Sequence, residues 1–105
     1  GSVNVPSGVA NETEGALPRT IRLDQNFPNP FNPSTSISYS LPQSQLVRLS
    51  VIDMLGREVA QLVNRVQTAG QNHVTFEAND LPSGIYMYRL EAGAFSVTKK
   101  MILFK

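Results

Sequence analysis

The feature that most constrains this chain is the alternation of apolar and polar residues in short runs, with turn-forming residues between the runs. The clearest run is Thr35–Leu41, in which Ile37, Tyr39 and Leu41 alternate with serines. Successive side chains of a strand point to opposite faces, so this spacing predicts a strand with one face in a core and the other in water. Such runs recur about every 8–12 residues, which is typical of a β-sandwich or a β-barrel.

Six further strands follow from the same pattern. They are predicted at Ile21–Gln25, Leu46–Met54, Glu58–Val63, His73–Glu77, Ile85–Leu90 and Phe95–Phe104, with a polar connection at Asn64–Gln71. Two hairpins are expected, one on each side of the middle of the chain. We therefore predict an all-β, immunoglobulin-like antiparallel β-sandwich of about seven strands.

The alternation also assigns the faces. The residues predicted to point into the core include Val47, Leu49, Val51, Val74, Phe76, Tyr86, Tyr88 and Leu90, and on the last strand Phe95, Val97, Met101 and Leu103. Leu46 and Ile52 lie on the second face of their strand, which is therefore expected to be partly covered.

Composition excludes several classes of function. Nine basic and eight acidic residues are scattered along the chain, and its net charge is +1, so no nucleic-acid partner is expected. The chain has no cysteine, which excludes disulfides and thiolate sites within it. No run approaches the roughly 20 apolar residues that cross a bilayer, so no membrane-spanning segment is predicted. No set of residues at metal-ligand spacing is present, and no cofactor is predicted.

The N-terminal stretch differs from the rest of the chain. Residues 1–20 are rich in Gly, Pro, Ser, Asn and Glu without a strand or helix period, which predicts a flexible linker. Gly1 and Ser2 look like a remnant of recombinant expression. We therefore expect residues 21–105 to be one domain that follows a larger N-terminal parent domain.

Four segments carry a family resemblance. Leu23–Thr35 reads LDQNFPNPFNPST and resembles the entry motif of A-type C-terminal sorting domains of the type IX (Por) secretion pathway. Val51–Val59 (VIDMLGREV), Leu81–Leu90 (LPSGIYMYRL) and Thr98–Lys105 (TKKMILFK) are similar to later segments of that family in the same order. The resemblance covers about residues 21–105. A related immunoglobulin-like module occurs in the flagellar hook-capping protein, so the fold alone does not assign the function.

The resemblance implies a non-catalytic domain that sends a larger protein, such as a glycosidase or protease, through the periplasm and outer membrane to the cell surface or medium. The implied partners are the outer-membrane type IX machinery, a sortase-like peptidase and the parent domain. The candidate recognition residues are Asn26, Pro28, Asn29, Pro30, Phe31, Asn32, Pro33, Lys99, Lys100 and Lys105.

Each of these candidates also has a structural interpretation. Three prolines between Phe27 and Ser34 make a stiff connector that resists pairing, and Phe27 and Phe31 are expected to plug one end of the sandwich. Lys99, Lys100 and Lys105 are expected on a solvated edge, where lysines discourage edge-to-edge pairing.

Other residues that invite a chemical role are assigned to structure. Asp53 has no second ligand beside it and is expected to accept hydrogen bonds from turn amides near Gly56. His73 lacks a serine or carboxylate motif and is expected to be structural. Two functions compete with sorting: a carbohydrate-binding accessory module and a structural spacer. The absence of tryptophan and the inward assignment of Tyr86 and Tyr88 argue against the first.

Overall fold

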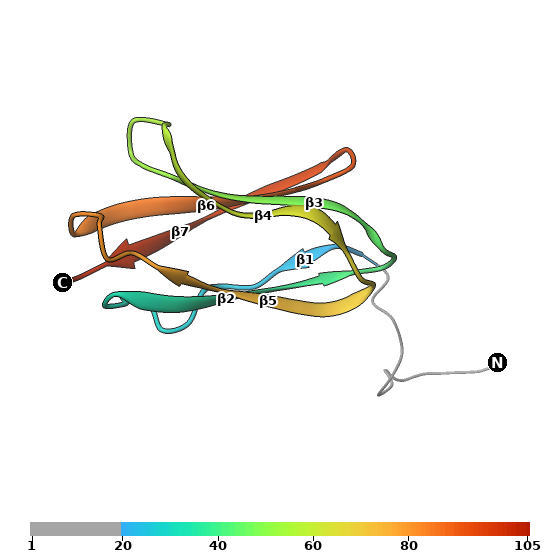
Figure 1. The fold of residues 1–105 in the computed structure, drawn as a ribbon, viewed down its shortest axis with the longest axis horizontal. Helices are drawn as coiled ribbons and strands as arrows, with labels where there is room; N and C mark the ends of the chain where they lie inside the picture. Colours follow the sequence, from blue (N-terminus) through green and yellow to red (C-terminus); the bar gives the residue numbers. More distant parts are fainter. Residues whose placement is uncertain (1–19) are drawn as a thin grey trace.

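The alternating runs form strands in the computed structural model, which describes residues 20–105 (Figure 1). The strands are β1 (Arg22–Leu23), β2 (Ser34–Leu41), β3 (Gln45–Ile52), β4 (Glu58–Gln67), β5 (Gly70–Glu77), β6 (Gly84–Ala92) and β7 (Phe95–Leu103). That part of the chain contains no helix that could cross a membrane. The linker predicted for residues 1–20 lies, apart from Thr20, outside the described residues.

The strands form two antiparallel sheets that face each other. One sheet has the order β1-β2-β5 and the other the order β4-β3-β6-β7. The chain changes sheet after β2, after β4 and again after β5, so the pairs β1–β2, β3–β4 and β6–β7 each stay within one sheet. The predicted immunoglobulin-like β-sandwich of about seven strands is confirmed.

The core lies between the two sheets and is built from alternate residues. Ile37, Tyr39 and Leu41 of β2 are fully buried, and the serines between them are half-buried. The inward assignments of Val47, Leu49, Val51, Phe76, Tyr86, Tyr88 and Leu90 are confirmed, since all are at most 5% exposed. The alternation of apolar and polar residues in the sequence therefore predicted the core face of each central strand correctly.

Both predicted hairpins are present. β3 pairs with β4 and β6 pairs with β7, each as an antiparallel neighbour. The turn between β3 and β4 contains Gly56 at a φ of 85°, a left-handed conformation that costs glycine little. Gly56 also donates its N–H to the Asp53 carbonyl at 3.0 Å, which closes the turn.

The connection predicted at Asn64–Gln71 is wrong in most of its length. β4 continues to Gln67 and pairs with β3 through Arg48–Asn64 and Leu46–Val66, and β5 already begins at Gly70. β4 is an edge strand whose end is solvated on both faces, so its pairing depends on backbone hydrogen bonds and leaves no apolar period in the sequence.

Four side-chain assignments also differ from the structure. Phe95 is 38% exposed and Val97 is half-buried, whereas Met101 and Leu103 are buried as predicted, because the β6–β7 hairpin rises away from the other sheet toward its turn (Figure 1). Leu46 is 60% exposed, although Ile52 on the same face is covered. Phe27 is 80% exposed and does not plug the sandwich, whereas Phe31 does.

Candidate recognition surface

The proline-containing segment joins β1 and β2 of one sheet and touches the other sheet on the way. Phe27 forms an antiparallel bridge with Ser36 of β2, and Phe31 forms a parallel bridge with Leu103 of β7. The peptide bonds before Pro28, Pro30 and Pro33 are cis. The expectation that this segment forms no strand pairing is therefore too strict, because it touches each sheet once.

Asn26 organises the start of this segment. Its side-chain nitrogen donates to Thr35 Oγ1 at 2.9 Å and to the Pro28 carbonyl at 3.1 Å, and its side-chain oxygen accepts a hydrogen bond from Gln25 Nε2 at 2.7 Å. Thr35 Oγ1 donates in turn to the same Pro28 carbonyl at 2.8 Å. Asn26 is only 2% exposed, so its amide is used in fixing the path of the segment.

Tyr88 ties this network to the core. The backbone N–H of Asn26 donates to the Tyr88 hydroxyl at 2.8 Å, and that hydroxyl donates to the Asp24 carbonyl at 2.7 Å. The Tyr88 ring is fully buried in the sandwich. Burial, above all, raises the pKa of Tyr88 to about 12, and the carboxylate of Asp24 adds to the effect.

The segment also covers the outer edge of β7 over the last part of that strand. Gln25 Nε2 donates to the Lys100 carbonyl at 2.8 Å, and the Ile102 N–H donates to Asn29 Oδ1 at 2.9 Å. Phe31 completes the contact, because its N–H donates to the Ile102 carbonyl and its carbonyl accepts from the Phe104 N–H, both at 2.9 Å. The proline-containing segment and the end of β7, more than 70 residues apart in sequence, are therefore side by side.

The candidate residues of this segment divide by exposure. Asn26 and Phe31 are each 2% exposed, so their side chains position the segment and are out of reach of a partner on the folded domain. Pro28, Asn29, Pro30 and Asn32 are exposed, and Pro33 is half-buried. The accessible part of the segment is therefore a short ridge, Phe27–Pro30 with Asn32, which we call the motif ridge.

The comparison with known families matches residues 25–104 to the secretion system C-terminal sorting domain. The match covers most of the chain and includes both ends of the surface just described. This chain belongs to the secretion system C-terminal sorting domain family. None of the curated proteins compared with it matches.

A solved structure agrees with the fold of the sorting domain. PorZ of Porphyromonas gingivalis, described as an essential bacterial surface component of the type-IX secretion system, superposes with a TM-score of 0.55 at 14% sequence identity. The alignment covers 90% of the sorting domain chain and 13% of PorZ, so the likeness concerns one part of that longer protein. At this identity the likeness supports the fold alone.

The three candidate lysines of the sorting domain have different environments. Lys100 is exposed on the outer face of β7, but Lys99 is half-buried because it points to the inner side, like Met101. Lys105 is exposed and donates from Nζ to the Asn79 carbonyl at 2.7 Å, which ties the last residue to the loop before β6. The expected solvated edge therefore applies to Lys100 and Lys105 and only in part to Lys99.

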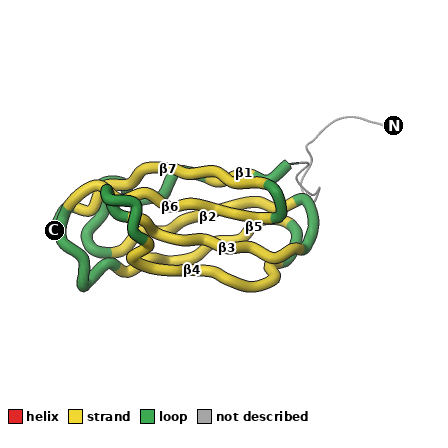
Figure 2. The backbone as a smooth tube through the Cα atoms, turned by 90° about the horizontal axis from the view of Figure 1, so that it is seen from above, coloured by secondary structure: helices red, strands yellow, loops and turns green. Residues whose placement is uncertain are grey.

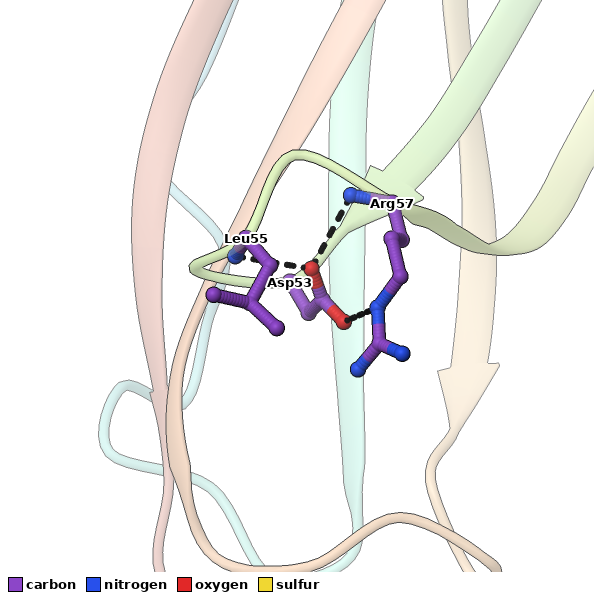
Figure 3. A network of polar contacts seen from close by, with 3 residues as sticks. All are labelled: Asp53, Leu55 and Arg57. Carbon is purple, nitrogen blue, oxygen red and sulfur yellow. Dashed lines mark hydrogen bonds and ion pairs between the residues drawn. The ribbon is translucent and has the colours of Figure 1, made fainter.

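Asp53 has the turn role predicted for it (Figure 3). One carboxylate oxygen accepts from the N–H groups of Leu55 and Arg57, at 2.9 and 3.0 Å, on either side of Gly56. The other oxygen accepts from Arg57 Nε at 2.8 Å. The hydrogen bond from the Arg57 backbone contributes most to lowering the pKa of Asp53, because it stabilises the carboxylate.

The other residues that could have had a chemical role, His73 and the tyrosines, form no metal site or sugar-binding site among the described residues. His73 is exposed on β5, and no group of three His, Asp or Glu side chains that could hold a metal occurs among residues 20–105. Tyr39, Tyr86 and Tyr88 are all buried, so none of them offers a ring to a sugar.

Phe27 is an exposed residue that was expected to be buried. The Phe27 ring is 80% exposed at the start of the motif ridge. Phe104, directly after β7, is 70% exposed. An apolar residue in a non-alternating segment carries no face information, so no sequence pattern could have found it.

Proposed function

We propose that residues 21–105 direct a larger protein, joined on their N-terminal side through the linker of residues 1–20, through the type IX pathway to the cell surface or medium. The family match over residues 25–104 supports this proposal. We further propose that the machinery reads the motif ridge together with the adjoining end of β7.

The observation that supports this choice of surface is the direct contact between the proline-containing segment and the end of β7. Asn29 accepts the Ile102 N–H, and Gln25 donates to the Lys100 carbonyl. A partner that binds here touches residues from both ends of the domain at once, and those residues meet only when the sandwich is folded. The surface is therefore suited to report that the domain has folded before export.

The buried residues of the motif support the proposal indirectly. Asn26, Thr35 and Tyr88 hold the start of the segment by hydrogen bonds of 2.7–2.9 Å, and the side chains of Phe27 and Asn32 are exposed. Such rigid positioning lowers the entropy cost of recognition, because the partner meets an ordered ridge.

The proposed partners are the outer-membrane type IX machinery and a sortase-like peptidase that removes the domain before surface attachment. The proposed parent is a secreted protein such as a hydrolase. Domains of this family are targeting modules, and the proposal assigns all catalysis to the parent.

A fusion experiment tests the surface. A periplasmically exported reporter carrying residues 21–105 is compared with the same fusion containing Phe27→Ser and Asn32→Ala, in a host that has the type IX system. We expect both fusions to fold and the variant to accumulate in the periplasm. The matched control is Leu46→Ser, which removes another exposed apolar side chain, 60% exposed, at the start of β3.

Export of the Phe27→Ser, Asn32→Ala fusion at the level of the control would remove the motif ridge from the proposal. Retention of the unmodified fusion in the periplasm would reject the sorting function itself and would favour a structural spacer.

A further inference from the structure

The outer edge of β7 is hydrogen-bonded to other described residues along only half of its length. β7 is the last strand of the order β4-β3-β6-β7, so one side of its backbone has no neighbouring strand from the described part of the chain. On that side the Lys100 carbonyl, both backbone groups of Ile102 and the Phe104 N–H are bonded by Gln25, Asn29 and Phe31.

On the other half of the edge, backbone groups of β7 have no hydrogen-bond partner among residues 20–105. In an antiparallel strand alternate residues bond the same neighbour, and β7 pairs with β6 without a register shift. Since the backbone groups of Lys100, Ile102 and Phe104 point to the outer edge of β7, those of Thr98 and Ser96 point to the same edge. Neither makes a backbone hydrogen bond on that side to any of residues 20–105.

The flanking side chains make this half-edge apolar on its inner side. Phe95 is 38% exposed, and Val97 and Ile21 are half-buried against the margin of the core. Figure 2 shows β7 and β1 along the same long side of the molecule. A strand placed here would bury alternate apolar side chains against Val97 and Phe95.

The charges favour an acidic occupant. Arg22 pairs with Asp24 at 3.2 Å, and Arg89 lies 3.9 Å from Glu91. Lys99 and Lys100 have no acidic partner within 4.0 Å among the described residues. One ammonium lies toward each face of the edge strand, so a carboxylate on either face of an added strand meets a lysine.

We propose that an extended segment of the secretion machinery adds to the β7 edge at Ser96–Lys100 as a further strand, with alternating apolar side chains and at least one carboxylate. This inference rests on the proposed function and specifies how recognition occurs: the backbone of Ser96 and Thr98 is read, next to the motif ridge that closes the remainder of the edge. A second copy of the chain is a poorer occupant, since pairing two β7 edges gathers four lysines.

Proline substitution on the free side tests the backbone contact. Thr98→Pro removes an N–H that β6 does not use, and proline is tolerated on an edge strand when its nitrogen faces outward. The matched control Thr98→Val keeps the N–H and the branched side chain. In the reporter fusion, Thr98→Pro should lower export about fivefold to tenfold at unchanged thermal stability, and Thr98→Val should not.

Equal export of the folded Thr98→Pro and Thr98→Val fusions would overturn the proposal while leaving the sorting function intact, because the unmodified fusion reports on that function separately. If Thr98→Pro unfolds the domain, Lys100→Glu replaces it, since this change repels a carboxylate without altering the backbone; unchanged export would again count against the proposal.

Amide exchange in the full chain gives a readout that does not depend on the host. The N–H groups of Val97 and Lys99 bond β6 and should exchange slowly, whereas those of Ser96 and Thr98 should exchange quickly. Protection of Ser96 and Thr98 in the isolated monomer, or a dimer in ultracentrifugation that Thr98→Pro abolishes, would show that the chain itself occupies the edge and would overturn the proposal.

Discussion

Replacing Tyr88 by phenylalanine should destabilise the domain through the motif and not through the core. The ring stays in its buried place, and only the hydroxyl is lost. That hydroxyl accepts from the Asn26 N–H at 2.8 Å and donates to the Asp24 carbonyl at 2.7 Å. The variant leaves the N–H of Asn26, a residue only 2% exposed, without an acceptor.

The magnitude follows from these two bonds. A buried donor left unsatisfied costs about 1–3 kcal/mol, and the lost bond to the half-buried Asp24 adds about 0.5–1.5 kcal/mol. We therefore expect Tyr88→Phe to lower the free energy of unfolding by about 2–4 kcal/mol, a large part of the roughly 5–15 kcal/mol typical of a domain.

Urea denaturation measures this difference, with Tyr86→Phe as the matched control. The Tyr86 hydroxyl makes one bond, to the Pro82 carbonyl at 2.7 Å, and Pro82 is exposed, so water can replace it. The control should lose about 0.5–1 kcal/mol, at an unchanged dependence on urea concentration. Losses for the two variants that agree within about 0.5 kcal/mol would refute the reasoning that Tyr88 holds the motif segment.

Four further predictions follow from the same structure. Leu49→Ala, at a fully buried site, should lower the free energy of unfolding by about 2–5 kcal/mol, and a loss below about 0.5 kcal/mol in denaturation would mean that the face of β3 is inverted. Stability should fall as the pH rises from 10 to about 12, because the unfolded chain releases the Tyr88 proton at lower pH than the folded one; a pH series of melting curves should show a shallower fall in Tyr88→Phe. Asp53→Ala should lower the melting temperature at neutral pH and reduce the loss of stability on acidification below about pH 3.8, since the lowered pKa of Asp53 makes its contribution vanish there; an unchanged acid response would contradict this. Lys99→Ala with Lys100→Ala should leave stability within about 0.5 kcal/mol and reduce export, and full export of the folded variant would place recognition elsewhere.

The strands and the core were predictable because burial on one face leaves a period of two in the sequence. In β2, Ile37, Tyr39 and Leu41 are fully buried, and the intervening serines meet solvent. The role of Asp53 was predictable for a local reason, since its partners, Leu55 and Arg57, lie within four residues of it.

The extension of β4 and the course of the motif segment were not predictable in this way. The end of β4, from Asn64 to Gln67, pairs through its backbone while its side chains are mostly solvated, so no apolar pattern marks it. The contact between Asn29 and Ile102 joins residues 73 positions apart, and no local propensity encodes such a distance. For the same reason the sequence named the motif residues without separating buried Asn26 and Phe31 from exposed Phe27.

The most direct test of the account is the location of a reporter that carries residues 21–105 at its C-terminus, measured as surface, medium and periplasmic fractions in a type IX-competent host and in the same host without the outer-membrane translocon. We predict that the reporter reaches the surface or medium only in the competent host and stays in the periplasm in the other. A reporter that stays in the periplasm of both hosts would contradict the claim that this folded domain is a sorting signal.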